Sequence, residues 1–219
     1  VVRSRQPVPS WWIGFSIISI AAICYLPAFP LDLYSGSRYL LQLHAVTEPW
    51  RLFDPRVIWS VQDNVGHYRP AGLAFTSAIT QIGHGLLIPA AIALHTANAL
   101  LVSRVAFIFW PANVQTALVA GALAVILPQA LDTVLNPFNQ PYLLLAFFYL
   151  ASIVTFDAAV QKRRLLGLIL SGLCFLAALV SSELAITLPF LLLGLTVIRR
   201  RFDLRTPFVM YGLLTFFVI

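Results

Sequence analysis

Apolar residues occur in long runs along this chain, and short segments carrying most of the polar side chains separate the runs. A helix needs about 20 mostly apolar residues to cross the hydrocarbon core of a bilayer. The pattern therefore predicts an all-α, polytopic transmembrane helical bundle of about seven spans. The expected spans are Trp11–Phe29, Leu86–Trp110, Thr116–Leu131, Tyr142–Val160, Leu165–Val180, Leu184–Ile198 and Pro207–Ile219.

Two stretches between the first and second spans have a different character. Residues 30–69 mix charged and polar side chains with aromatic residues such as Trp50. Tryptophan side chains commonly anchor segments at the membrane interface. We expect a long, folded outer loop there. Residues 70–84 are expected to form a short interfacial helix, and Gly83 and Gly85 separate it from the span that follows.

Basic residues give the expected orientation. Arg3 and Arg5 precede the first span, residues 162–164 lie between the fourth and fifth, and residues 199–205 lie between the sixth and seventh. With a cytoplasmic N-terminus, alternation places all three clusters in the cytoplasm, where Lys and Arg are enriched, and the first large loop outside. Counting residues 70–110 as two spans would divide the clusters across the membrane, so we expect one span there.

The composition agrees with a membrane location. Hydrophobic residues make up 60% of the chain and charged residues 10%, whereas a soluble domain has about a quarter of its residues charged. The net charge of +6 comes from the short clusters between spans, so no nucleic-acid partner is indicated. Residues 1–219 are expected to form a single membrane domain surrounded by lipid. Because the chain begins at Val1 and ends inside an apolar run, we expect it to be part of a longer protein.

Three carboxylates are candidates for a functional site. Asp32 follows the first expected span, Asp132 the third, and Glu183 lies where the fifth meets the sixth, so all three are expected on the outer face. An isolated ionisable group within a span costs about 2.5–3.5 kcal/mol on insertion scales, which suggests a polar pocket at this face. Alternatively, each carboxylate caps a helix N-terminus, where it meets the positive end of the helix dipole. Both interpretations remain open.

A second candidate is the sequence His67-Tyr68-Arg69-Pro70, where the outer loop meets the short helix. Arginine offers a rigid and permanently charged fork of donors that suits phosphate or carboxylate. Proline fits the first turn of a helix. The alternative is that the arginine extends to the phosphates of the surrounding lipid.

His95 and Asn98 are spaced to share one face of the second span. Polar residues inside spans commonly form hydrogen bonds with neighbouring helices, so we expect a structural polar pair in preference to a ligand site. The sequence contains no metal-binding cluster of convincing spacing and no phosphate-binding glycine loop. Asp32 and Asp132 could share a divalent metal, but their spacing does not indicate one.

Several of these features follow one another in a recognisable order: Asp32 after the first span, Tyr68-Arg69-Pro70, and residues 95–102, 128–132 and 182–189. Together they resemble the N-terminal membrane module of GT-C-type glycosyltransferases, in particular the bacterial, protein-mannosyltransferase-like and TPR-linked branches. The sequence HTANALLV is similar to the family's H-x-x-N-x-L-L-V helix, PQALD to its H-P-x-H-x-E segment, and SELAITLP to its K-E-x-x-x-x-x-P segment.

The resemblance implies an inverting hexosyltransferase of the bacterial inner membrane that uses a polyprenyl-phosphate sugar on the outer face. Asp32 would be the catalytic base, which takes a proton from the acceptor hydroxyl. Asp132 and Glu183 would be supporting acidic residues. Arg69, with His67 and Tyr68, would bind the donor phosphate.

Two other functions remain in view. Leu127, Ala130 and Ser182 stand where the family has His, His and Lys, so the chain could instead be a catalytically degenerate, structural subunit that docks with other membrane subunits. A transporter is less favoured, because transporters often show internal repeats and none is evident here.

Overall fold

The structure, a computed structural model, shows an all-helical fold. Helices and turns account for the described residues, with no strand among them, which confirms the expected all-α class for this part of the chain. Asp32, His67, Tyr68 and the expected seventh span lie outside the described residues. The structure describes residues 10–28, 46–61, 69–111, 113–136, 139–162 and 164–199.

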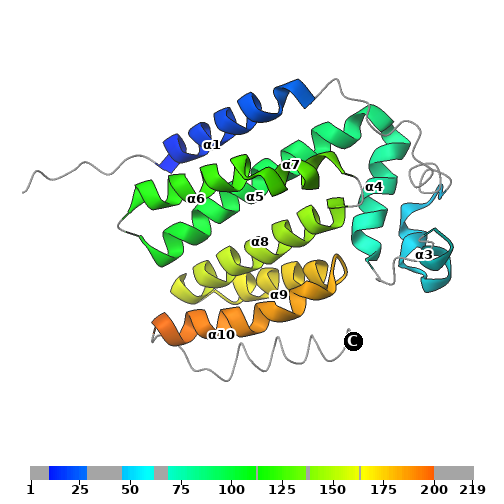
Figure 1. Cartoon of the computed structure of the whole chain (residues 1–219). Coiled ribbons are helices and arrows are strands. Elements are labelled where there is room, and N and C mark those ends of the chain that lie inside the picture. Colours follow the sequence, from blue (N-terminus) through cyan, green and yellow to red (C-terminus); the bar gives the residue numbers. More distant parts are fainter. Residues whose placement is uncertain are drawn as a thin grey trace, which may run out of the picture.

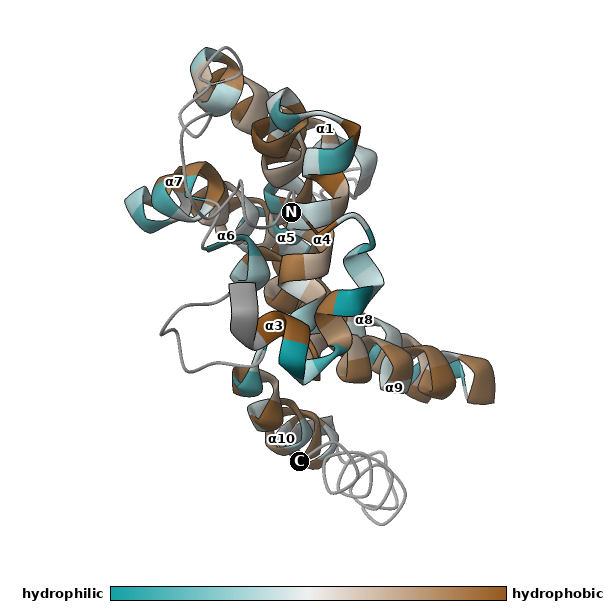
Figure 2. Ribbon diagram, turned by 90° about the vertical axis from the view of Figure 1, so that its right-hand side faces the viewer, coloured by the Kyte–Doolittle hydropathy of each residue, from teal (hydrophilic) through white to brown (hydrophobic). Residues whose placement is uncertain are grey.

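The longer helices run side by side, and two shorter ones lie across one end of them (Figure 1). The aligned helices are α1 (Ser10–Tyr25), α5 (Leu87–Phe109), α6 (Val114–Ile126), α8 (Gln140–Lys162), α9 (Leu165–Leu179) and α10 (Leu188–Arg199). Across their ends lie α3 (Pro55–Val61) and α4 (Pro70–Ile82). Figure 2, turned by 90°, shows α3 and α4 in front of the aligned helices, with α9 extending to one side.

Helix length and composition support a membrane protein with transmembrane helices. Within the described part of the chain, three helices are long and apolar enough to cross a membrane: Trp11–Ala28, His84–Phe109 and Gln140–Lys162. Val114–Ile126, Leu165–Leu179 and Glu183–Val197 are apolar but shorter. Leu165 and Leu166 on α9 are 72% and 77% exposed, which suits contact with lipid better than contact with water. The count of seven spans stays a prediction.

Small side chains bring the aligned helices close together. Ser152 of α8 and Ser171 of α9 exchange hydrogen bonds, each hydroxyl donating to the other residue's backbone carbonyl oxygen at 2.9 and 2.8 Å. On α6, a Cβ atom added to Gly121 would meet the side chain of Ile17 and would lie 3.1 Å from the carbonyl oxygen of Ala99. Such close approach between helices is typical of packing in membranes.

The third expected span is not one continuous helix. Leu127 is extended (φ −60°, ψ 133°) and separates α6 from the short α7 (Pro128–Leu135). Proline disfavours the helical conformation of the residue before it and lacks an N–H group, so the chain breaks at this point. The expectation of a single helix through Leu131 is therefore wrong.

The helix break expected before the second span is present. α4 ends at Ile82, Gly83 follows in an extended conformation, and a 3₁₀ turn at His84–Leu86 leads into α5. Because α4 lies across the bundle while α5 runs along it, this break sets the position of α4 at the bundle's end (Figure 1).

Candidate functional site

Arg69 is the centre of a polar cluster at the α4 end of the bundle. Its Nη2 donates to Oε1 of Glu183 at 2.9 Å, its Nε to Oε2 of the same carboxylate at 3.4 Å, and its Nη1 to the Tyr142 hydroxyl at 2.8 Å. The guanidinium carbon also lies 4.6 Å from the centroid of the Tyr142 ring. The cluster thus joins the start of α4, the start of α8 and the segment after α9.

Local sequence explains why Arg69 is held in this place. Pro70 occupies the first turn of α4, which leaves Arg69 as the residue before the helix. The next backbone N–H group, that of Ala71, donates to the carbonyl oxygen of Val180 at the end of α9 at 3.1 Å. Gly72 lies so close to the Pro141 ring that a Cβ atom would clash with it. Arg69 is therefore fixed against both α8 and α9.

Further along α4, a buried hydrogen bond strengthens the contact with α8. The Thr76 hydroxyl donates to Oε1 of Gln140 at 2.8 Å, and both side chains are almost completely buried. A buried polar group without a partner would be costly, so this pair favours one position of α4 on the bundle.

Glu183 begins a 3₁₀ turn, Glu183–Thr187, directly after Ser182. Ser182 is the capping residue of this turn, and its hydroxyl accepts from the N–H group of Leu184 at 3.4 Å. Capping is therefore done by the serine, while the Glu183 side chain turns to Arg69. The two partners differ in burial: the Arg69 side chain is 9% exposed, whereas that of Glu183 is 53% exposed. The carboxylate is thus held by arginine on one side and open on the other.

The environment of Arg69 keeps its guanidinium charged. Burial lowers the pKa of Arg69, but the hydrogen bonds that it donates to Glu183 and Tyr142 and the opposite charge of Glu183 outweigh burial, so the pKa lies above its usual value. Arg69 is therefore the permanently charged member of the ion pair.

Asp132 has a different partner. It is exposed on α7, and its Oδ2 accepts a hydrogen bond from the side-chain nitrogen of Asn139 at 2.8 Å. Arg69 and Asp132 therefore make separate contacts, Arg69 directly before α4 and Asp132 on α7. The geometry that would join Asp132 to Asp32 involves a residue outside the described part of the chain.

His95 and Asn98 are buried on α5, at 7% and 5% exposure. The side-chain nitrogen of Asn98 donates to the carbonyl oxygen of Leu143 on α8 at 2.9 Å. The His95 ring meets the Tyr25 ring of α1 edge-on, with the centroids 5.6 Å apart. The pair thus contacts two neighbouring helices, and its structural role stays a prediction.

Sequence reasoning missed Tyr142, Gln140 and Thr76. Tyr142 opens an apolar run and Gln140 stands just before it, so nothing in the pattern distinguished them from residues at the boundary of a span. Among the residues that the structure describes, no group of three or more His, Cys, Asp or Glu side chains could hold a metal ion.

Comparisons with known proteins do not extend these observations. No family model, no curated protein and no solved structure matches the chain. Proposals about its function therefore depend on the motifs in the sequence and on the geometry of the α4 end.

Proposed function

We propose that this chain is the membrane module of a GT-C-like glycosyltransferase, which transfers a sugar from a polyprenyl-phosphate donor to an acceptor on the outer face of the membrane. In this proposal about seven spans cross a bacterial inner membrane, the N-terminus is cytoplasmic, and the α4 end of the bundle faces outward.

One observation carries the proposal: Arg69 binds Glu183, 114 positions further along the chain. These residues belong to two separate segments that resemble GT-C motifs, the Tyr-Arg-Pro sequence and the Glu-containing segment before the last described helix. A resemblance by chance gives no reason for the two segments to meet. Their contact at one end of the bundle is the arrangement that a shared site requires.

Charge supports the proposed orientation. Arg104 lies on the last two turns of α5, Lys162 at the end of α8 and Arg164 directly before α9. Since α5, α8 and α10 all finish opposite α4, these cations gather at the other end of the bundle (Figure 1). Basic residues favour the cytoplasmic side, which leaves the Arg69 cluster outside.

The proposed roles follow from what each group contacts. Asp32 is the proposed base, and Glu183 and Asp132 offer exposed carboxylate oxygens that can accept hydrogen bonds from sugar hydroxyls. Arg69 already uses three of its five N–H groups on Glu183 and Tyr142 and is nearly buried. We therefore assign Arg69 first to positioning Glu183, while its part in binding the donor phosphate with His67 and Tyr68 stays a prediction.

Replacing the proposed base tests the enzyme directly. Membranes containing the Asp32→Asn protein should lose transfer of radiolabel from polyprenyl-phosphate mannose, glucose or galactose, because amide nitrogen and oxygen cannot take up the acceptor proton. Loss of a general base typically costs about 10²–10⁴-fold in rate. Glu48→Gln is the matched control, since this loop carboxylate makes only an exposed pair with Arg51. Transfer by Asp32→Asn at the wild-type rate would remove Asp32 from the mechanism.

A second function is favoured by the apolar surface of α9. Leu165, Leu166 and Leu173 are each more than half exposed, and such a face can bind a neighbouring membrane subunit as well as lipid. A catalytically degenerate subunit would purify in mild detergent as a stoichiometric complex with unrelated partners and without a bound polyprenyl-phosphate sugar. An active module would carry the donor lipid and transfer its sugar.

A further inference from the structure

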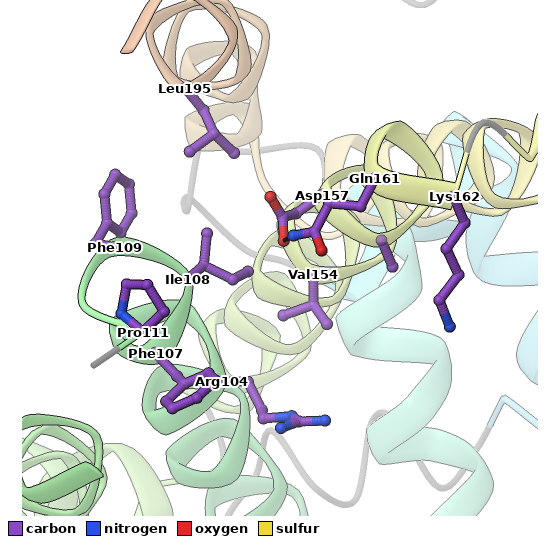
Figure 3. Close-up of a pocket in the computed structure, with 11 residues that line it drawn as sticks. Arg104, Phe107, Ile108, Phe109, Pro111, Val154, Asp157, Gln161, Lys162 and Leu195 are labelled. Atoms are coloured by element: carbon purple, nitrogen blue, oxygen red, sulfur yellow. Dashed lines mark hydrogen bonds between the residues drawn. The ribbon is translucent and has the colours of Figure 1, made fainter. Parts of the chain in front are cut away.

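At the end of the bundle opposite α4, the helices form an open pocket of about 710 Å³ (Figure 3). Its walls come from the last turns of α5 and α8 and from Leu195 of α10. The volume is in the range of sites that hold small molecules or lipid headgroups. This pocket is separate from the Arg69 cluster and has no part in the proposed sugar transfer.

The polar groups of the pocket lie on α5 and α8. Arg104 and Lys162 are exposed, and in Figure 3 their side chains extend toward the same side of the pocket. Asp157 is 5% exposed, and its Oδ2 accepts a hydrogen bond from the Gln161 side chain at 2.7 Å. Two cations and one carboxylate give the lining a net charge of +1, which matches a ligand with a single negative charge.

The remaining walls are apolar. Phe107, Ile108, Phe109, Val154 and Leu195 line the pocket beside the charged groups. Trp110 follows directly at the end of α5 and is 58% exposed, as is usual for tryptophan at a membrane interface. The pocket therefore combines a cationic part with an apolar surface. A free anion would not contact the apolar surface, whereas an acyl chain would.

The depth of Arg104 explains why a bound anion would be favourable. Arg104 lies five residues before Phe109, the end of a candidate span, which is about 7.5 Å along a helix axis at 1.5 Å per residue. A cation at that depth is unfavourable beside hydrocarbon unless it reaches water or a counter-charge. A lipid phosphate at the membrane surface supplies the counter-charge, and arginine forms the strongest contacts with phosphate oxygens.

We propose that the Arg104–Lys162 pocket binds the phosphodiester of an anionic phospholipid from the cytoplasmic leaflet. The phosphate contacts the two cations, and the acyl chains run toward the bilayer centre along Val154 and Leu195. Basic pockets between transmembrane helices on the cytoplasmic side have the chemistry to select such headgroups.

Native mass spectrometry of the full protein in dodecyl maltoside tests this proposal. Phosphatidylglycerol and phosphatidylcholine with the same chains are added at rising concentrations, and bound lipid is counted. The Arg104→Gln/Lys162→Gln protein should bind phosphatidylglycerol about 30-fold more weakly than the wild type. Lys162→Gln alone should bind it about fivefold more weakly, because each basic residue near a membrane surface contributes about a fivefold gain in affinity. Phosphatidylcholine binding should not change.

The control variant Arg56→Gln/Arg164→Gln removes two exposed cations outside the pocket and has the same net charge. It should bind phosphatidylglycerol like the wild type. Equal weakening in this control, or unchanged binding in both pocket variants, would overturn the proposal. Chain-free glycerophosphoglycerol and inorganic phosphate should compete poorly with the lipid, and competition at equal concentration would assign the pocket to a soluble phosphate instead.

Discussion

Arg69 combines burial with a charged contact between distant parts of the chain. Its guanidinium is almost enclosed, and Glu183 supplies the opposite charge from a residue that is half open to the surroundings. Removing one partner of such a pair leaves the other charge without compensation, and the cost depends on how deeply the remaining charge is buried. In this pair the deeply buried charge is the cation.

Glu183→Gln should therefore lower the free energy of unfolding by about 1–2 kcal/mol, less than for a fully buried pair because solvent screens the exposed carboxylate. Unfolding by SDS in mild detergent measures this change. Glu48→Gln, which removes one partner of an exposed pair, should change it by less than about 0.5 kcal/mol. Equal effects of the two substitutions would show that the Arg69 contact adds nothing to stability.

The ion pair should also keep its strength at alkaline pH. Because the pKa of Arg69 is raised on folding, its contribution is fully present below the unfolded pKa and is lost only as the pH rises through the still higher folded pKa. A double-mutant cycle with Arg69→Gln and Glu183→Gln should give the same coupling energy at about pH 7 and about pH 10. A fall in coupling over this interval would contradict the described environment of Arg69.

At the level of single residues, the sequence identified the two charged partners but not their contact. Arg69 and Glu183 stand out because charges are rare in an apolar chain, yet nothing in the local pattern measures a distance across 114 positions. Tyr142 could not be found in advance, because an aromatic residue at the start of a span is also the usual interfacial anchor.

Among the elements, α4 is held by close packing as well as by charge. Gly72 meets the Pro141 ring of α8, so Gly72→Ala would force the two helices apart or displace the ring. We expect a loss of about 1–3 kcal/mol in the free energy of unfolding, as for other overpacked sites. SDS unfolding in detergent is again the measurement.

Gly194→Ala serves as the comparison, because none of the described residues lies within 4 Å of a Cβ atom at that position of α10. Alanine has the better helix propensity, so this variant should be unchanged or more stable by up to about 1 kcal/mol. Destabilisation by Gly194→Ala equal to that by Gly72→Ala would mean that the contact with Pro141 is not the cause.

The sequence predicted helices well where apolar runs were long and failed where a proline lay beyond the first turn of an expected span. α5 and α8 follow the expected spans closely, since each is a continuous apolar segment. The run from Thr116 to Leu131 looked equally continuous, but Pro128 begins a new helix within it. Hydropathy registers proline only as a mildly polar residue, while its effect on the backbone is what divides the run.

For the whole molecule, the central claim is that the two ends of the bundle lie on opposite sides of the membrane. The basic clusters of the sequence predict this orientation, and the helix directions bring Arg104, Lys162 and Arg164 to the end opposite α4. Both the proposed outer sugar-transfer site and the proposed lipid pocket require it. Neither chain length nor helix packing alone distinguishes inside from outside.

Single-cysteine labelling tests that orientation most directly. In a Cys24→Ala/Cys174→Ala background, Arg56→Cys places a thiol at an exposed position of α3, and Arg164→Cys places one at the other end of the bundle. A membrane-impermeant maleimide should label Arg56→Cys in intact cells and should label Arg164→Cys only after the membrane is permeabilised. Labelling of both positions from one side, or labelling in the reverse order, would contradict the account.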